Sequence, residues 1–264
     1  MTFDNIQFQS HEGYAVLTFN RPQALNSFTQ AMHAEIREVL EQVSTDNSIR
    51  CLVITGAGRG FCAGQDLNDR AVNAHADQAA NLGESVERSY NPLVRLITRM
   101  EKPVICAVNG VAAGAGASVA LACDIVLAGR SASFIQSFSK IGLVPDSGGS
   151  WNLPHALGLP RAKALALLGK KLSAKQAENW GMIWQCLDDD DLMPEAVKMA
   201  EHLAAQPILG LAATKALMNS ASTRSLEEQL ELEKDEMQRL GNTHDYREGV
   251  AAFVEKRKPV FTGS

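Results

Sequence analysis

The chain has 264 residues, of which 45% are hydrophobic and 21% are charged, a balance typical of a globular protein. This length predicts one large domain, or one domain with a small appendage, whose core needs neither disulfides nor metals to hold it. A formal net charge of -5 argues against a surface built for nucleic acid or an anionic membrane, but it leaves room for a local site that binds an anionic ligand.

Five cysteines occur without any C-x-x-C pair: Cys51, Cys62, Cys106, Cys123 and Cys186. Three of them lie in or beside apolar runs, so we predict buried thiols in a reducing compartment. The first residues lack the basic and apolar regions of a signal peptide. The closest candidate for a membrane span, residues 104–128, is interrupted by Asn109, Asp124 and glycines. We therefore expect a cytoplasmic protein.

Strand and helix signals alternate through the first half of the chain. Residues 14–19 form a short β-rich run, and Asn26-Ser27 is predicted to open a helix whose apolar positions recur at helical spacing. Continuous apolar runs at 51–55, 104–108 and 124–128 predict strands buried on both faces. This alternation predicts an α/β core with parallel strand pairing.

The rest of the chain is predicted to be mainly helical. Residues 70–89 are polar and weakly patterned, which predicts a loop or a marginal helix. The segments 173–176 and 225–228 are typical of capping boxes that open helices. We expect a core with the functional site in residues 1–200, and a helical C-terminal region for oligomerisation and cover of the site in residues 201–264.

Two glycine- and alanine-rich segments, residues 60–67 and 109–117, each follow a predicted buried strand. Their small side chains would let peptide N–H groups point into one cavity, the second set at a helix N-terminus. Tight packing and turns are an alternative explanation of the same pattern. A dinucleotide site at residues 56–61 is disfavoured, because Phe61 stands where the third glycine of G-x-G-x-x-G belongs. The histidines lack ligand spacing, so we expect no metal site.

Several motifs resemble, in the expected order, the signatures of the crotonase (enoyl-CoA hydratase/isomerase) superfamily. They are N-R-P at Asn20, F-C-A-G-x-D-L at Phe61, K-P-V-I-C-A-V-N-G at Lys102, G-A-G-A-S-V-A-L-A-C-D at Gly114, G-L-V-P-D-S-G-G-S-W at Gly142 and E-G-x-x-A-F at Glu248. Together they extend the resemblance over essentially the whole chain.

The resemblance implies the crotonase (ClpP/crotonase-like) α/β fold, a spiral of ββα repeats with a helical C-terminal region that forms trimers or dimers of trimers. It implies an acyl-CoA substrate, with no cofactor beyond the CoA that the substrate carries. The two backbone N–H donors of the family's oxyanion hole fall on Cys62 and Ala115 by motif position. The implied CoA contacts are Arg21, Ala63, Gly64, Gln65, Asp66, Leu67 and Lys256, although the basic run at Lys256 is equally compatible with a solvated tail.

The carboxylates distinguish between the reactions of this family. Its hydratases carry two glutamates that activate water, and the matching positions here are Ser118 and Phe138, which we place in the acyl pocket. Asp146 stands where dienoyl-CoA isomerases have a catalytic aspartate, although Pro-Asp-Ser-Gly is also a turn signature. One carboxylate can take a proton from one carbon and return it to another, so the resemblance implies an isomerase.

At finer grain, the chain resembles the branch of the family that converts ring-1,2-epoxyphenylacetyl-CoA to 2-oxepin-2(3H)-ylideneacetyl-CoA in phenylacetate catabolism. The segments that carry this resemblance are G-A-G-R-G-F-C-A-G-Q-D-L-N-D-R, S-V-E-R-x-Y-N-P-L-V-R, W-G-M-I-W-Q and D-Y-R-E-G-V-x-A-F. The alternatives are a Δ3-Δ2-enoyl-CoA isomerase or hydratase of aliphatic acyl-CoA, and a non-catalytic acyl-CoA-binding homologue. The acyl group, the choice between trimer and hexamer, any residual hydratase activity and the role of residues 70–90 stay open.

Overall fold

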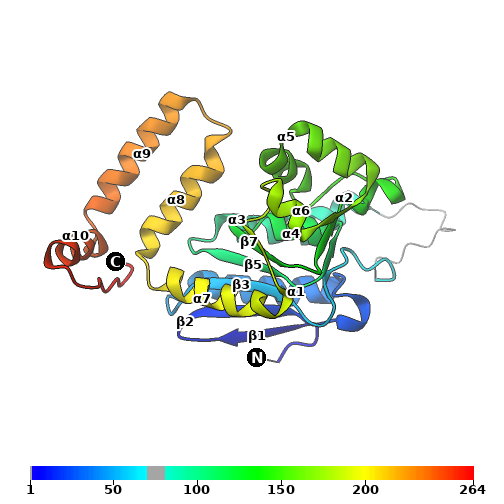
Figure 1. The fold of residues 1–264 in the computed structure, drawn as a ribbon, viewed down its shortest axis with the longest axis horizontal. Helices are drawn as coiled ribbons and strands as arrows, with labels where there is room; N and C mark the ends of the chain where they lie inside the picture. The colour runs from blue at the N-terminus through cyan, green and yellow to red at the C-terminus, as the bar shows by residue number, and fades with distance from the viewer. Residues whose placement is uncertain (1, 70–80) are drawn as a thin grey trace.

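Two β-sheets form the centre of the computed structural model, which describes residues 2–69 and 81–264 (Figure 1). The larger sheet has six strands in the order β1-β2-β3-β5-β7-β10. These strands are β1 (Ile6–Ser10), β2 (Gly13–Phe19), β3 (Ile49–Gly56), β5 (Val104–Val108), β7 (Ile125–Gly129) and β10 (Gln185–Leu187). In this sheet β1 pairs antiparallel with β2, and the other neighbouring strands pair in parallel.

The smaller sheet extends the pattern of two strands followed by a helix. Its strands are β4 (Gly60–Cys62), β6 (Val111–Ala113), β8 (Ser133–Ile135) and β9 (Lys171–Ser173), in that order. Each long strand β3, β5 and β7 is followed by one of the short strands β4, β6 and β8, and then by helical chain. The predicted parallel α/β core with ββα repeats is therefore present.

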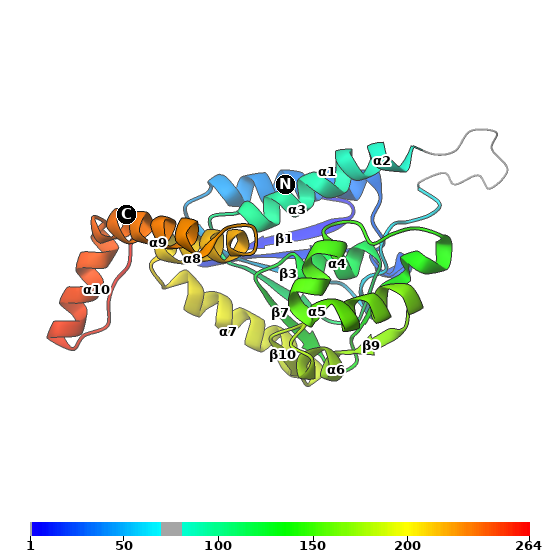
Figure 2. The ribbon, with the colours of Figure 1, turned by 90° about the horizontal axis from the view of Figure 1, so that it is seen from above.

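Helices cover both faces of the larger sheet, as its apolar strands require. The α-helices of the described residues are α1 (Gln30–Thr45), α2 (Leu82–Ser85), α3 (Asn91–Arg99), α4 (Ala115–Leu121), α5 (Gly149–Leu168), α6 (Ala174–Asn179), α7 (Leu192–Ala204), α8 (Ile208–Ala221), α9 (Leu226–Gly241) and α10 (His244–Glu255). A π-helical turn, Val86–Tyr90, joins α2 to α3. Figure 2 shows α1 and α3 on one face of the sheet and α7 on the other. The buried side chains accordingly form two apolar clusters, one on each face.

The predicted start of the first helix was wrong by a few residues. Leu25 and Asn26 have positive φ angles of 49° and 57°, so they belong to a turn. The helix begins at Gln30, and Thr29 caps it by accepting a hydrogen bond from the N–H of Met32. By contrast, the capping box predicted at 225–228 is present with both of its hydrogen bonds. Residues 82–89 of the weakly patterned segment are helical, Asn81 caps the first of these turns, and residues 70–80 lie outside the described residues.

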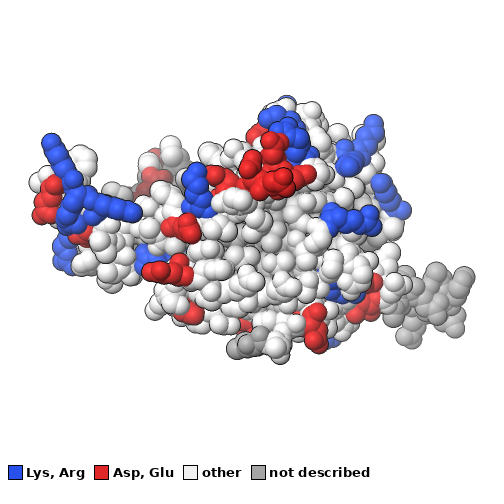
Figure 3. Space-filling model, turned by 60° about the horizontal axis from the view of Figure 1, so that its bottom comes forward, with Lys and Arg blue, Asp and Glu red and all other residues white. Residues whose placement is uncertain are grey.

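The last three helices form a C-terminal arm, α8 to α10, which projects beyond the sheets (Figure 1). Within the arm, α8 buries only Ala213 and α9 buries no residue. Large apolar side chains such as Met237 and Phe253 are exposed there. No described helix is long and apolar enough to cross a bilayer. The face seen in Figure 3 carries charges of both signs around a broad uncharged area, as a small net charge predicts.

A partly buried ion pair fastens the arm to the core. The Lys215 ammonium of α8 lies 2.8 Å from the Asp124 carboxylate and donates to the carbonyls of Ile97 (2.8 Å) and Lys102 (3.3 Å). The carboxylate also accepts a hydrogen bond from the N–H of Val104. Burial raises the pKa of Asp124, and the nearby Lys215 opposes that rise. The ion pair therefore places the start of β5, the start of β7 and the arm in one arrangement.

Replacing Lys215 with methionine is expected to destabilise the chain by about 1–3 kcal/mol, because it leaves the partly buried Asp124 carboxylate without its cation. Denaturant unfolding measures the loss. The loss should grow as the pH rises through the raised pKa of Asp124, since only the ionised carboxyl needs the cation. Lys198→Met removes an exposed partner of Glu195 and should cost less than about 1 kcal/mol. Equal losses for the two variants would contradict the assigned role.

Candidate active site

A cavity of about 580 Å³ lies where three segments meet. The segments are the chain after β4, the junction of β6 with α4, and the chain between β8 and α5. The cavity is lined by Ala63, Gly64, Gln65, Leu67, Leu82, Gly114, Ala115, Ser137, Phe138, Lys140, Ile141, Leu143 and Asp146. Most of these residues are apolar, and Asp146 is the one carboxylate among them. The structure thus brings both predicted glycine-rich segments and Asp146 to one place.

Backbone hydrogen bonds fix the peptide between Gly64 and Gln65. The Gly64 carbonyl accepts a hydrogen bond from the N–H of Phe28 at 2.7 Å. Two residues further along, the N–H of Asp66 donates to the Phe28 carbonyl at 2.9 Å. Since the C=O and N–H of a trans peptide point in opposite directions, the N–H of Gln65 points away from Phe28. In the described part of the chain, this N–H has no acceptor.

Gly64 brings that peptide against the start of α4. Its φ of +92° is one that other residues rarely adopt. A Cβ atom at Gly64 would lie 2.9 Å from the carbonyl oxygen of Ala113 and 3.5 Å from the backbone nitrogen of Ala115. Only a residue without a side chain permits this approach, so Gly64 is required both by its backbone angle and by the space available.

Ala115 supplies a second N–H at the same place. It is the first residue of α4, and the carbonyl of the preceding Gly114 accepts the first hydrogen bond of the helix, from the N–H of Ser118. The first N–H groups of a helix have no partner inside it. Among the described residues, no acceptor faces the Ala115 N–H either. Two unpaired peptide N–H groups beside one apolar cavity can bind a carbonyl oxygen and stabilise negative charge on it.

The prediction for Cys62 is not supported by this geometry. Cys62 lies inside β4, is fully buried, and is not among the residues that line the cavity. Its carbonyl faces Gly116, where a Cβ atom would come within 2.3 Å of that oxygen. Burial raises the pKa of the Cys62 thiol to about 12, so it stays neutral. The pairing of β4 with β6 continues through Cys62, and the chain reaches the cavity only beyond it, at Ala63, Gly64 and Gln65.

Asp146 occupies a tight turn that also opens α5. Ser147 and Gly148 both have positive φ angles, 53° and 76°, and the Gly149 N–H donates to the Asp146 carbonyl at 2.8 Å. The Ser147 hydroxyl donates to Oδ1 of Asp146 at 2.9 Å. The turn suggested by the sequence is therefore present, and Asp146 within it lines the cavity.

The two positions that hold glutamates in hydratases differ in their surroundings. Phe138 lines the cavity, as predicted, and makes that wall apolar. Ser118 does not line it, contrary to prediction: it is fully buried, and its hydroxyl donates to the Gly114 carbonyl at 3.4 Å. The reason is that α5 starts directly against it, since a Cβ atom on Gly149 would lie 2.4 Å from the Ser118 hydroxyl.

The residues predicted to contact CoA divide into three sets. Ala63, Gly64, Gln65 and Leu67 line the cavity. Arg21 and Asp66 do not line it, and their side chains pair with each other at 3.0 Å. Lys256 is the C-cap of α10, a helix of the projecting arm (Figure 1), and it does not line the cavity.

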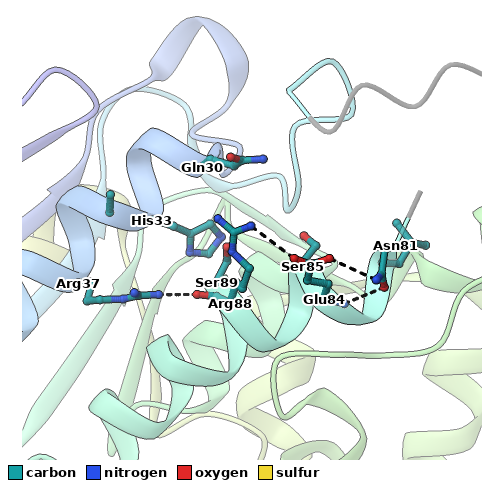
Figure 4. A pocket seen from close by; sticks show the side chains of 10 residues that line it. Gln30, His33, Arg37, Asn81, Glu84, Ser85, Arg88 and Ser89 are labelled. Carbon is teal, nitrogen blue, oxygen red and sulfur yellow. Dashed lines mark hydrogen bonds and ion pairs between the residues drawn. The ribbon is translucent and has the colours of Figure 1, made fainter. Parts of the chain in front are cut away.

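A neighbouring cavity of about 430 Å³ lies between α1 and α2 (Figure 4). Its polar side chains bond mainly to their own surroundings: the Arg37 guanidinium donates to the Arg88 carbonyl, Arg88 pairs with Glu84, and Asn81 caps α2. No group of three His, Cys, Asp or Glu side chains in residues 2–69 and 81–264 could hold a metal ion. We therefore place the chemistry in the cavity that contains Asp146.

Comparison with known proteins settles the family. The sequence profile described as "Enoyl-CoA hydratase/isomerase" matches residues 9–264. The chain belongs to the enoyl-CoA hydratase/isomerase family. It is 58% identical over 252 residues to the 1,2-epoxyphenylacetyl-CoA isomerase of Escherichia coli, covering 96% of each chain. It is 32% identical to the trans-2-decenoyl-[acyl-carrier-protein] isomerase of Streptococcus mutans, over all of both chains.

Solved structures of this family share the fold. The crystal structure of an enoyl-CoA hydratase from Polaromonas sp. JS666 matches with a TM-score of 0.89 and 36% identity, over 97% of this chain and 99% of that one. The predicted crotonase-type fold is thereby confirmed.

Proposed function

We propose that this protein is an isomerase of CoA thioesters that converts ring-1,2-epoxyphenylacetyl-CoA to 2-oxepin-2(3H)-ylideneacetyl-CoA. Among the described residues, the observation that carries the proposal is one carboxylate, Asp146, in an apolar cavity beside two backbone N–H groups that have no acceptor. The positions where hydratases carry water-activating glutamates are Ser118 and Phe138. The substrate is proposed from the E. coli relative, a 1,2-epoxyphenylacetyl-CoA isomerase.

In the proposed mechanism, the thioester oxygen accepts hydrogen bonds from the N–H groups of Gln65 and Ala115. These donors stabilise the enolate that forms when Asp146 removes a proton from the carbon next to the carbonyl. The electron pair left on that carbon forms a double bond to the substituted carbon of the epoxide. The C–C bond shared by the epoxide and the six-membered ring breaks, so the oxygen becomes part of a seven-membered ring. The displaced pair moves through the two ring double bonds to the ring carbon that will take up the proton. Asp146 returns the proton to a ring carbon, so that the composition of the substrate is unchanged.

The remaining assignments belong to the same proposal. The adenosine and pantetheine parts of CoA would lie along Ala63, Gly64, Gln65 and Leu67, and no cofactor beyond CoA is needed. Arg21 could reach a phosphate only by giving up part of its bonding to Asp66 and to the Ser27 carbonyl. Lys256 could serve only the site of another chain in a homotrimer or a dimer of trimers. The exposed apolar side chains of the arm support such an assembly.

A turnover assay tests the proposal directly. Purified protein is offered epoxyphenylacetyl-CoA, with hydration of crotonyl-CoA measured in parallel. We expect isomerisation of the epoxide at a rate at least about a hundredfold above hydration, because one carboxylate can shuttle a proton but the pair that activates water is missing. Hydration as fast as isomerisation would contradict the assignment. Binding of both thioesters without any turnover would indicate a non-catalytic acyl-CoA-binding homologue.

A double-bond shift in aliphatic 3-enoyl-CoA is the second candidate, since it needs the same base and the same N–H pair. The similarity to the decenoyl isomerase of S. mutans favours it. A panel of aromatic and aliphatic CoA esters separates the two, and the ester with the highest kcat/KM identifies the preferred acyl group.

A further inference from the structure

Three hydrogen bonds fix the side chain of Gln65, the residue whose N–H faces the cavity. Its Nε2 donates to the carbonyls of Phe28 (3.1 Å) and Asp66 (3.0 Å), and its Oε1 accepts from the Tyr90 hydroxyl at 2.7 Å. Both ends of the amide are thus engaged, which leaves it one orientation. The hydroxyl of Tyr90 is the only one of these contacts that comes from outside the two backbone segments paired at this point.

Tyr90 reaches Gln65 from an unusual position in the chain. It ends the π-helical turn Val86–Tyr90 between α2 and α3. Such turns are rare in proteins, and those that occur often lie at functional sites. Its ring is fully buried, edge-on to Phe28 at 5.9 Å and to His33 at 4.5 Å. The ring packing would be satisfied by phenylalanine. The hydroxyl is the feature that phenylalanine could not supply.

We propose that Tyr90 is a positioning residue that holds the Gln65 N–H in the direction required by the thioester oxygen. The inference deepens the proposed function and rests on it. Gly64, the preceding residue, has no side chain that could hold the Gly64–Gln65 peptide, so its orientation depends on the Phe28 pairing and on the Gln65 side chain. A donor fixed before the reaction stabilises developing charge without reorganising, so a loosened donor loses part of its effect.

Tyr90 is also connected through the chain to the wall of the cavity. Leu82 of α2 lines the cavity, and the π-helical turn connects α2 directly to Tyr90. One hydroxyl therefore ties the wall that α2 provides to the segment that carries the N–H donor. No catalytic step is assigned to Tyr90 itself, since it acts only through Gln65.

The test is Tyr90→Phe, with Tyr14→Phe as the matched control, because Tyr14 is buried in the cluster on the opposite face of the larger sheet. Binding of phenylacetyl-CoA is compared with binding of the thioether analogue that lacks the carbonyl oxygen. We expect Tyr90→Phe to weaken thioester binding and to lower kcat, each by about five- to tenfold, and to leave thioether binding unchanged. Tyr14→Phe should change neither.

Two outcomes would overturn the proposal: undiminished thioester binding in Tyr90→Phe, or an equal loss for both ligands, which a merely structural role produces. If Tyr90→Phe does not fold, Gln65→Leu removes the same hydrogen bond from its other end, and the same comparison of ligands applies. With both variants folded, Tyr90→Phe/Gln65→Leu should be no worse than Gln65→Leu alone. The binding arms need no turnover, so they test Tyr90 even if the epoxide proves not to be the substrate.

Discussion

Asp146→Asn is expected to lower isomerase turnover by about 10²–10⁴-fold, the range that a positioned acid–base group contributes. The amide keeps the size of the carboxyl and can still accept the hydrogen bond from Ser147, so the turn that opens α5 should persist. It cannot take up a proton from carbon. Turnover of epoxyphenylacetyl-CoA measures the effect, and unchanged affinity for the thioether analogue shows that the cavity is intact.

A second aspartate provides the control for this change. Asp190 belongs to the exposed acidic run before α7, away from the cavity, and Asp190→Asn should leave turnover within about twofold of the unchanged protein. Near-normal turnover in folded Asp146→Asn would remove the catalytic assignment. The turn would then be the sole reason for an aspartate at this position.

Ala115→Pro is expected to lower turnover by about 10²–10³-fold, the usual effect of removing one oxyanion donor. Ala115 is the first residue of α4, a position where proline is well tolerated because the lost N–H has no intrahelical partner. The substitution therefore deletes the N–H that no ordinary side-chain change can reach. Steady-state kinetics with the epoxide, together with thermal unfolding, separate loss of the donor from loss of the fold.

Leu226→Pro makes the same chemical change at the first residue of α9, on the arm. The preceding Ser225 has φ and ψ of -71° and 159°, which suit a residue before proline. We expect this variant to keep its turnover. If Ala115→Pro retained turnover as well, the thioester oxygen could not be bound by the Ala115 N–H.

The sequence by itself determined the type of core. Continuous apolar runs predicted β3, β5 and β7, because strands buried on both faces have no polar side to show. Local hydrogen bonds were also predictable from the sequence, as the capping box at Ser225 shows. The family and the identity of Asp146 as the carboxylate of interest likewise came from the order of the motifs.

Only the tertiary structure decided which backbone groups face the cavity. We propose Gln65 as the N–H donor in place of Cys62, because the pairing of β4 with β6 holds Cys62 in the ladder. The last paired residue of a strand is not marked in its sequence. Ser118 does not line the cavity because α5 packs directly on it, and this contact joins segments about 30 residues apart in the chain. The sequence did not indicate a role for Tyr90 for the same reason, since its hydroxyl bonds to Gln65, which lies 25 residues away in the chain. Spacing and composition encode local geometry, whereas the direction of a peptide N–H depends on partners that folding brings from elsewhere.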